Sequence, residues 1–164
     1  MHSVVYRSTN GGASWFQISQ GVNLSPGGEQ GFYDLCIAVS PVNPDRIFVG
    51  NVEFIRSDNG STFSIIRDSN AYGGGSALFD SYTHVDHHVI KFAPSNPSVM
   101  YVGCDGGVFK STNSGQSFFS VNTGFNTTQC YRLASHPFNA DRIYTGLQDN
   151  GFISTINRGA TPYT

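Results

Sequence analysis

Short apolar runs alternate with clusters of turn residues along this chain, and three of the runs share one pattern. In each, a proline is followed by an asparagine two positions later and by a glycine nine positions later. The three segments are LCIAVSPVNPDRIFVGNVEFIRS (35–57), VIKFAPSNPSVMYVGCDGGVFKS (89–111) and YRLASHPFNADRIYTGLQDNGFIS (131–154). Three matches at fixed offsets indicate an internal repeat, with 53 and then 43 residues between the prolines.

Each repeat predicts strands joined by tight turns, as the second repeat shows. Apolar runs at 89–92, 99–103 and 108–110 predict three strands. The turn Pro94-Ser-Asn-Pro between the first two fits because proline fixes φ and asparagine can bond the nearby backbone. Asp105-Gly106 predicts a hairpin between the second and third strands, with φ above zero in the turn.

A second motif, Ser-x-Asn-x-Gly-x-Ser-aromatic, follows the third strand of a unit, and its aromatic residue is expected to open a fourth strand. It occurs at 8–15 and 111–118, and in a form one residue shorter at 57–63. A degraded copy is expected after Ser154. The motif residues are Ser8, Asn10, Gly12, Trp15, Ser57, Asn59, Phe63, Ser111, Asn113, Gly115 and Phe118.

This motif resembles the Asp-box, or BNR repeat, of β-propeller proteins such as sortilin-type receptors and xyloglucan-degrading glycosidases. The resemblance implies a loop between the third and fourth strands of a blade, in which Ser and Asn bond the loop backbone. It also implies that glycine takes the unusual dihedral and that the aromatic residue packs between blades. The fold class expected is all-β, with four-stranded antiparallel propeller blades, and units of roughly 40–50 residues agree with it.

A narrower resemblance covers most of the chain. The stretches GFYDLCIAVSPVNPDRIFVG, THVDHHVIKFAPSNPSVMYVGCDGGVFKS and GLQDNG are similar to large secreted propeller proteins of Bacteroidetes-type bacteria, which type IX secretion exports. This resemblance implies an extracellular or cell-surface location, and it implies no particular activity.

The domain organisation expected is one partial propeller over 1–164. It contains a blade-closing strand at 14–19, blades at 34–67 and 87–122, and an incomplete blade at 130–164. These amount to three to three and a half blades, whereas closed propellers have about four to eight. We therefore expect the chain to be part of a larger propeller, whose partners are the remaining blades of a parent chain or other copies of itself.

Composition narrows the function further. Charged residues are only 12% of the 164, and the net charge is -2. No basic patch is available for nucleic acid, and the composition is unlike that of a helical bundle. The longest apolar run, 35–39, is too short to insert in a membrane. Cys36, Cys104 and Cys130 fit no zinc motif.

Propeller topology is expected to gather the remaining polar residues at one face, the mouth of the channel. The residues concerned precede a first strand or lie in a hairpin between second and third strands. The ligand-binding candidates are Tyr33, His84, Asp86, His88, Asp105, Gln148 and Asp149. Alternation in an extended segment would put His84, Asp86 and His88 on one side, where they could bind a divalent transition metal, act as acid and base, or form a structural network. No other cofactor is expected.

Two functions remain open. One is a non-enzymatic module that binds a protein or a glycan at this face. The other is a glycoside hydrolase that uses the carboxylates of Asp34, Asp86, Asp105 or Asp149. Hydrolysis would need carboxyl groups about 5–5.5 Å apart for retention or about 6.5–9.5 Å apart for inversion. The binding module is favoured, because the motifs are architectural and no catalytic signature is complete.

Overall fold

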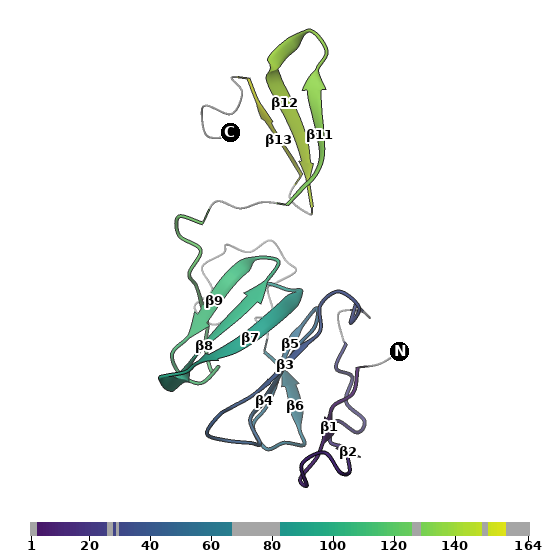
Figure 1. Ribbon diagram of the computed structural model, residues 1–164, viewed down its shortest axis with the longest axis vertical. Coiled ribbons are helices and arrows are strands. Elements are labelled where there is room, and N and C mark those ends of the chain that lie inside the picture. Colours follow the sequence, from purple (N-terminus) through teal and green to yellow (C-terminus); the bar gives the residue numbers. More distant parts are fainter. Residues whose placement is uncertain are drawn as a thin grey trace. The chain divides into compact units, whose positions relative to one another are not determined.

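The computed structural model describes residues 3–25, 28, 30–66, 83–125, 129–148 and 151–156. All regular elements in these ranges are β-strands in antiparallel sheets (Figure 1). The chain divides into two compact units, Met1–Thr123 and Gly124–Thr164, which are described separately. In the described ranges, no helix has the length and apolar character needed to cross a membrane.

The described residues of the first unit form a strand pair and two four-stranded sheets. In each four-stranded sheet the strands pair in chain order, so that every strand lies antiparallel to the next. We call β3-β4-β5-β6 the first sheet and β7-β8-β9-β10 the second sheet. The strands are β1 (Tyr6–Arg7), β2 (Phe16–Gln17), β3 (Cys36–Val39), β4 (Ile47–Gly50), β5 (Phe54–Ser57), β6 (Phe63–Ile65), β7 (His87–Ala93), β8 (Asn96–Cys104), β9 (Gly107–Ser111) and β10 (Phe119–Ser120).

The described residues of the second unit form a three-stranded antiparallel sheet that follows the same order. Its strands are β11 (Cys130–His136), β12 (Asn139–Leu147) and β13 (Phe152–Thr155). The sequence-based prediction of an all-β fold with four-stranded antiparallel blades is therefore confirmed. That the sheets belong to one partial propeller with the predicted boundaries stays a prediction.

The repeated asparagine closes the turn between the first two strands of every sheet. Its Oδ1 accepts a hydrogen bond from the backbone N–H two residues later. The three bonds run from Asp45 to Asn43, from Ser98 to Asn96 and from Asp141 to Asn139, each at 3.0 Å. The same local chemistry therefore sets the same turn three times.

The hairpin between β8 and β9 differs from its prediction in one detail. Cys104 pairs with Gly107 across the turn, and the left-handed residue is Gly107, with φ 102°. Neither Asp105 nor Gly106 has a positive φ, so the turn is not of the primed type with two left-handed central residues. The flexibility of glycine is used at the start of β9 instead.

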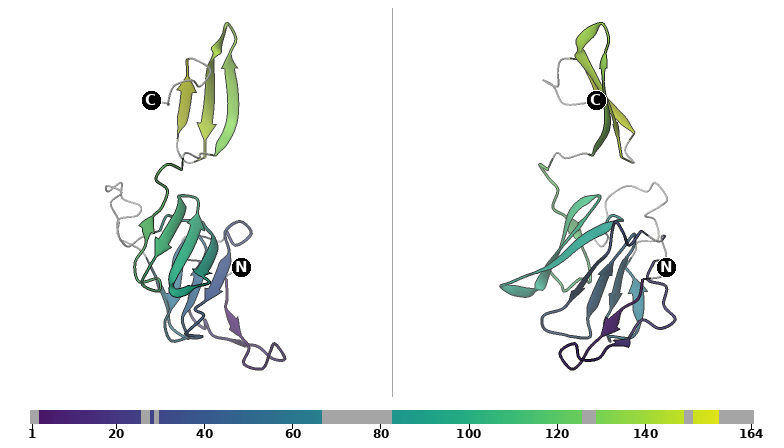
Figure 2. Two further views of the ribbon diagram at one scale, coloured as in Figure 1. Left: turned by 60° about the vertical axis from the view of Figure 1, so that its left-hand side comes forward. Right: turned by 45° about the vertical axis from the view of Figure 1, so that its right-hand side comes forward.

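Two hydrophobic clusters hold the first unit together. One lies on the β1–β2 side of the first sheet and contains Val5, Leu24, Ile47, Val49, Ile55 and Phe63. The other lies between the first and second sheets and contains Phe48, Phe54, Ile90, Met100, Val102 and Phe118. Successive side chains of β4 alternate between the two clusters, so the first sheet is covered on both faces (Figure 2).

The second sheet is covered on one face only among the described residues. Val89, Tyr101 and Val108 lie on its other face, which we call the outer face, and Tyr101 is 39% exposed. The repeat register aligns these three residues with Cys36, Phe48 and Phe54 of the first sheet. Those counterparts contribute to the cluster between the sheets. Tyr101 is thus exposed, whereas Phe48, its counterpart in the preceding repeat, is buried.

The Ser-x-Asn loops are closed by their own side chains. Ser111 Oγ donates to Asn113 Oδ1 at 2.9 Å and accepts the backbone N–H of Gly115 at 2.9 Å. Asn113 Oδ1 also accepts backbone N–H groups of Gln116 and Ser117. Gly115 has φ 77°, and a Cβ on it would lie 2.5 Å from the Phe48 ring. Both its conformation and its surroundings therefore require glycine.

The aromatic residues of these loops do not all pack as the resemblance implies. Phe118 is fully buried between the two sheets and Phe63 is buried beside β1 and β2. Trp15 is 62% exposed, and its Nε1 donates to the carbonyl of Gly12 in its own loop. The expectation that Trp15 packs between blades is therefore wrong for this structure, because no described strand lies over it.

Candidate functional site

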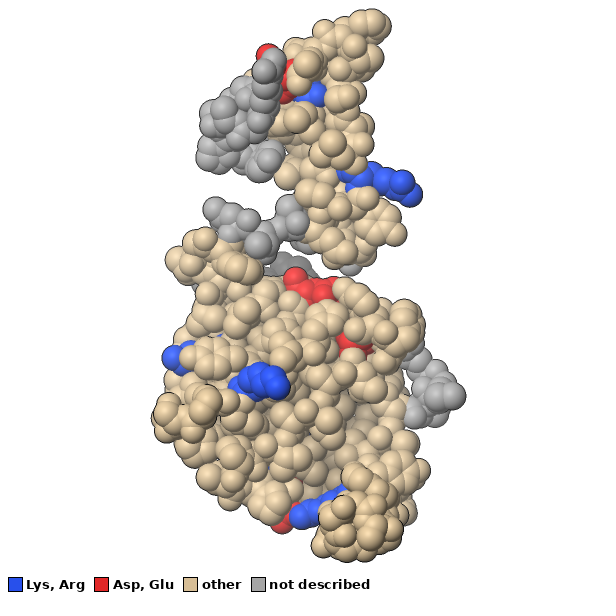
Figure 3. All heavy atoms as spheres, viewed as in Figure 1, with Lys and Arg blue, Asp and Glu red and all other residues tan. Residues whose placement is uncertain are grey.

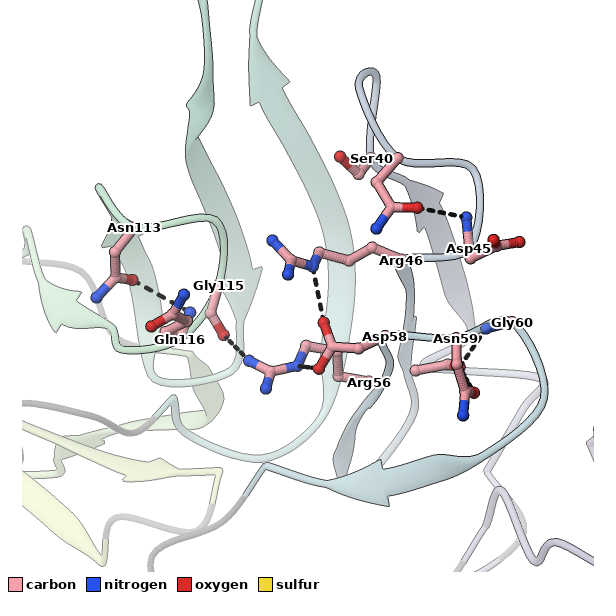
Figure 4. Close-up of polar contacts among 12 residues, drawn as sticks. Ser40, Asp45, Arg46, Arg56, Asp58, Asn59, Gly60, Asn113, Gly115 and Gln116 are labelled. Atoms are coloured by element: carbon pink, nitrogen blue, oxygen red, sulfur yellow. Dashed lines mark hydrogen bonds and ion pairs between the residues drawn. The ribbon is translucent and has the colours of Figure 1, made fainter.

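The loops and turns gather at one end of the sheets, where charged side chains are paired. Asp58 accepts from Arg46 Nε at 2.7 Å and from Arg56 Nε at 2.9 Å (Figure 4). Arg56 Nη1 also donates to the carbonyl of Gly115 in the second sheet at 2.7 Å. A hollow in this region is lined by Arg56, Asp58 and Gln116, among others. Its charged groups already serve the contact between the sheets, so we do not place the functional site there.

Charge is sparse elsewhere on the surface. In the view of Figure 3, acidic and basic side chains are scattered and form no single patch. This face therefore offers no cluster of charged side chains to a ligand that binds through many ion pairs, such as a nucleic acid.

The opposite end of the sheets brings together three of the predicted site residues: Tyr33, His88 and Asp105. Tyr33 lies in the turn before β3, His88 lies on β7, and Asp105 lies in the β8–β9 hairpin. Asp105 Oδ1 is 2.7 Å from His88 Nε2, and the Tyr33 hydroxyl is 3.2 Å from both Asp105 oxygens. The rings of Tyr33 and His88 meet edge to face, with centroids 4.8 Å apart. We call these residues the Tyr33 group.

The Tyr33 group is open to solvent. Tyr33 is 47% exposed and His88 is also exposed. Desolvation and the carboxylate of Asp105 raise the pKa of Tyr33, so its hydroxyl stays protonated and donates. The site therefore combines an aromatic ring, a carboxylate and an imidazole at the surface.

Directly beside this group lies a pair of carboxyls, Asp34 and Asp86. Asp34 is completely buried, and neither of its side-chain oxygens accepts a hydrogen bond from the described residues. Burial, and then the neighbouring carboxyl of Asp86, raise the pKa of Asp34 to about 7. Two carboxyls can bond each other only when one carries a proton, which is why proximity to Asp86 favours the protonated form.

Asp86 has an unusual backbone that links the two sheets. Its φ is 61°, a left-handed conformation that aspartate tolerates better than most residues. Its N–H donates to the carbonyl of Val52, and its own carbonyl accepts the N–H of Asp105. Gln30 Nε2 lies 3.4 Å from its side-chain Oδ1. Asp86 therefore joins the β4–β5 hairpin to the β8–β9 hairpin.

His87 is a structural residue that the sequence analysis did not select. It is buried against Phe54, with ring centroids 5.0 Å apart. Its Nδ1 is 2.8 Å from the carbonyl of Asn51, so this nitrogen carries the hydrogen, and Nε2 accepts from Thr83 Oγ1 at 2.8 Å. Burial lowers the pKa of His87 to about 4, and the ring is neutral. Strict alternation back from Ile90 would put His88 inward and His87 outward. A register shift between His87 and Val89 turns His87 inward instead, so the sequence pattern gave no signal for it.

The predicted metal set of His84, Asp86 and His88 is not assembled. The left-handed backbone at Asp86 ends the alternation, because 83–86 is not an extended strand. His84 packs against Gly106, with Nδ1 3.2 Å from the carbonyl of Val85, and His88 is held by Asp105. Within the described ranges, no three or more His, Cys, Asp or Glu side chains gather in a way that could hold a metal ion.

The remaining candidates belong to the second unit. The N–H of Gln148 donates to the carbonyl of Gln129 at 3.1 Å. Asp149 lies outside the described residues. That both share a face with Asp34, Asp86 and Asp105 stays a prediction.

Comparisons with known proteins yield a match among solved structures only. No model of a known protein family matches this chain, and no curated protein matches it. One solved structure that resembles it is that of an ancestral GH74 enzyme, with 24% sequence identity and a TM-score of 0.45. The match covers 93% of this chain and 20% of that enzyme, so the chain spans about a fifth of the enzyme's length.

Proposed function

We propose that this chain is a propeller module of a secreted or cell-surface bacterial protein and that it binds a glycan at the Tyr33 group. The observation that supports this is the exposed contact of Tyr33 with His88 and Asp105. A sugar ring has an apolar C–H face and a rim of hydroxyls. An exposed aromatic ring can cover the first, and a carboxylate can accept hydrogen bonds from the second.

The surroundings of the group suit binding better than chemistry. Asp105 is held from two directions, by Tyr33 and by His88, so it presents a fixed acceptor. Its own N–H is bonded to the carbonyl of Asp86. A carboxylate fixed in this way loses little conformational freedom when a ligand binds.

We further propose that the partners of this module are further propeller blades, from a parent chain or from other copies. The outer face of the second sheet supports this, because Tyr101 and Val108 take the register of the packed Phe48 and Phe54. The same face also carries Lys91 and Lys110, and Lys110 Nζ lies 5.6 Å from the centroid of the Tyr101 ring, so a partner here would meet apolar and basic groups together.

The glycan proposal is tested by calorimetric titration with oligosaccharides of the β-glucan, xyloglucan, chitin and sialylated types. Wild type should bind at least one type. Tyr33→Ala should weaken that binding by about tenfold or more, which corresponds to about 1.4 kcal/mol. Tyr101→Ala is the matched control, because it also removes an exposed tyrosine but from the outer face. Equal binding by Tyr33→Ala and wild type, or no binding by wild type, would refute the proposal.

A glycoside hydrolase is the second candidate, and the raised pKa of Asp34 favours it, since a general acid needs a proton near neutral pH. The complete burial of Asp34 opposes it, because a buried carboxyl cannot touch a substrate. Release of reducing ends from the same oligosaccharides, lost in Asp86→Asn or Asp105→Asn, would support the hydrolase over the binding module.

A further inference from the structure

A basic residue stands immediately before each Ser-x-Asn loop, and two of these residues take part in contacts between neighbouring sheets. The three basic residues are Arg7, Arg56 and Lys110. In the two contacts described below, the basic side chain of one sheet lies on the glycine of the loop in the next sheet. The third basic residue, Lys110, lies on the outer face of the second sheet, which the described residues of the first unit leave uncovered.

In the first contact, Arg7 of the β1–β2 pair lies on Gly60 in the loop of the first sheet. Gly60 has φ 70°, and a Cβ on it would lie 3.0 Å from Arg7 Nη1. The same nitrogen donates to Asp45 Oδ1 at 2.6 Å, which holds the guanidinium beside the loop. The left-handed glycine therefore leaves room for a cation from the neighbouring strand pair.

In the second contact, Arg56 of the first sheet lies on Gly115 in the loop of the second sheet. Arg56 Nη1 donates to the carbonyl of Gly115 at 2.7 Å (Figure 4). Phe48 pairs with Arg56 across the strands and lies on the same glycine, because a Cβ on Gly115 would be 2.5 Å from its ring. Phe118 of the loop meets Phe54 of the first sheet edge to face, with centroids 5.4 Å apart. One cation and two aromatic rings of the first sheet therefore receive the loop.

The outer face of the second sheet carries the same arrangement of side chains. Tyr101 pairs with Lys110 across β8 and β9, and Val108 lies beside them on the same side. By the register of the repeats, these three residues correspond to the two aromatic residues and the cation that receive the Gly115 loop. The ammonium of Lys110 lies over the Tyr101 ring, and the described residues give it no hydrogen bond or ion pair. The outer face therefore has the side chains of a loop receptor.

The loop at 8–15, which we call the Ser8 loop, is the loop that the described residues leave without such a receptor. Gly12 has φ 92°, and a Cβ on it would meet no described atom of another strand within 4 Å, only Trp15 of the same loop at 3.7 Å. Trp15 is 62% exposed, whereas Phe118 is buried at the same position of its motif. The carbonyl of Gly12 accepts from Trp15 Nε1, and a carbonyl oxygen can accept a second hydrogen bond.

We propose that Tyr101, Val108 and Lys110 of one molecule bind the Ser8 loop of a second copy of this chain. This inference rests on the proposal that further blades cover the outer face, and it names the partner and its contacts. Lys110 donates to the carbonyl of Gly12, and the Tyr101 ring lies on the same glycine. Trp15 packs against Val108, so that apolar surface of both copies leaves water, which favours association.

A second copy fits because the Ser8 loop and the outer face lie at opposite ends of the first unit. The β1–β2 pair packs on one face of the first sheet, and the second sheet packs on the other (Figure 2). The loop therefore cannot reach the outer face of its own molecule, but it can reach that of another.

The test is sedimentation velocity of the full chain over a series of protein concentrations. Wild type should form dimers and larger species as the concentration rises. Lys110→Glu and Trp15→Ala should each weaken this association by about tenfold or more. Arg132→Glu and Phe138→Ala are the matched controls, because they change an exposed cation and an exposed aromatic residue of the second unit, and they should associate as wild type does. All four variants should keep the far-ultraviolet circular dichroism of wild type, so that lost association is not unfolding.

A mixture of the two weakened variants tests which surface meets which. Lys110→Glu keeps an intact Ser8 loop, and Trp15→Ala keeps an intact outer face. The loop of the first variant can therefore dock on the face of the second, and the two should form a one-to-one complex with the affinity of wild type. Nothing larger should form, because the remaining loop and the remaining face of that complex are both altered.

Three results would overturn the proposal. A wild type that stays monomeric at every concentration would show that a second copy is not the occupant of the outer face. Unchanged association of Trp15→Ala would exclude the Ser8 loop, as would be expected if two identical outer faces met. Absence of a complex in the mixture would exclude the pairing of loop and face. None of these results bears on the glycan proposal, and a monomeric wild type would still allow blades of a parent chain as partners.

Discussion

Replacing Ser111 by alanine and, separately, Ser8 by alanine compares the same loop in two surroundings. Both serines make the same bonds. Ser8 Oγ donates to Asn10 Oδ1 at 2.9 Å and accepts the N–H of Gly12 at 2.8 Å, which matches the bonds of Ser111. The two loops differ in burial, since Ser111 is fully buried whereas the Ser8 loop is exposed. Any difference in stability therefore measures burial rather than bond geometry.

The magnitudes follow from what replaces the lost hydroxyl. In Ser111→Ala the N–H of Gly115 loses its acceptor in a buried place, and water cannot reach it. A buried unsatisfied donor costs about 1–3 kcal/mol, so we expect Ser111→Ala to lose about 2 kcal/mol. In Ser8→Ala, water can bond the freed N–H of Gly12, and we expect a loss of about 0.5 kcal/mol.

The assay is equilibrium unfolding in urea, followed by tryptophan fluorescence and by far-ultraviolet circular dichroism. Both probes are needed, because the chain has one tryptophan and it lies in the loop of Ser8. A cooperative transition with unchanged slope would allow the midpoints to be compared directly. Equal losses in the two variants, or a larger loss in Ser8→Ala, would refute the reasoning from burial.

Three further predictions address the core, a buried histidine and the thiols. Gly115→Ala should cost about 2–4 kcal/mol in a urea melt, because its φ is 77° and the new Cβ would collide with the Phe48 ring; a neutral effect would contradict this. The folded pKa of His87 is lowered to about 4 from 6.5, so its contribution to stability is full above pH 6.5 and is lost as the pH falls towards 4. We therefore expect the difference in unfolding free energy between wild type and His87→Gln to shrink by about 3 kcal/mol over that range. If urea melts gave a constant difference, the ring would not be buried as a neutral group. Exposed Cys130 should react with a thiol reagent in the folded chain, whereas buried Cys104 should react only after unfolding; equal rates would disagree with the structure.

The parts of the fold set by local chemistry could be predicted from the sequence. The asparagines that follow the repeat prolines bond the backbone two residues later in all three turns. The Ser-x-Asn loops likewise depend on residues a few positions apart. Such features need no knowledge of the neighbouring sheet, so the pattern of residues is enough to place them.

The features that sequence reasoning missed depend on contacts between distant segments. Asp34 meets Asp86 only because two sheets pack together, and its burial comes from that packing. The left-handed backbone at Asp86 ended the alternation on which the three-residue metal site was based. Trp15 is exposed because no described strand covers its loop, whereas Phe118, at the same position of the motif, is buried between two sheets. The motif specifies the loop, and the neighbours decide the burial of its aromatic residue.

The packing of the two sheets has a direction. The face of the first sheet that carries Phe48 and Phe54 meets a different face of the second sheet, which carries Met100 and Phe118. When a contact joins two different surfaces, each added sheet leaves one of these surfaces uncovered. Further sheets can therefore be added until their rotation closes a ring. The outer face of the second sheet, with Tyr101, repeats the first kind of surface. The addition of blades that we propose at this face would therefore be polar. A sheet that docks there would have to offer the kind of face that carries Met100, and two copies meeting through identical outer faces would break the order.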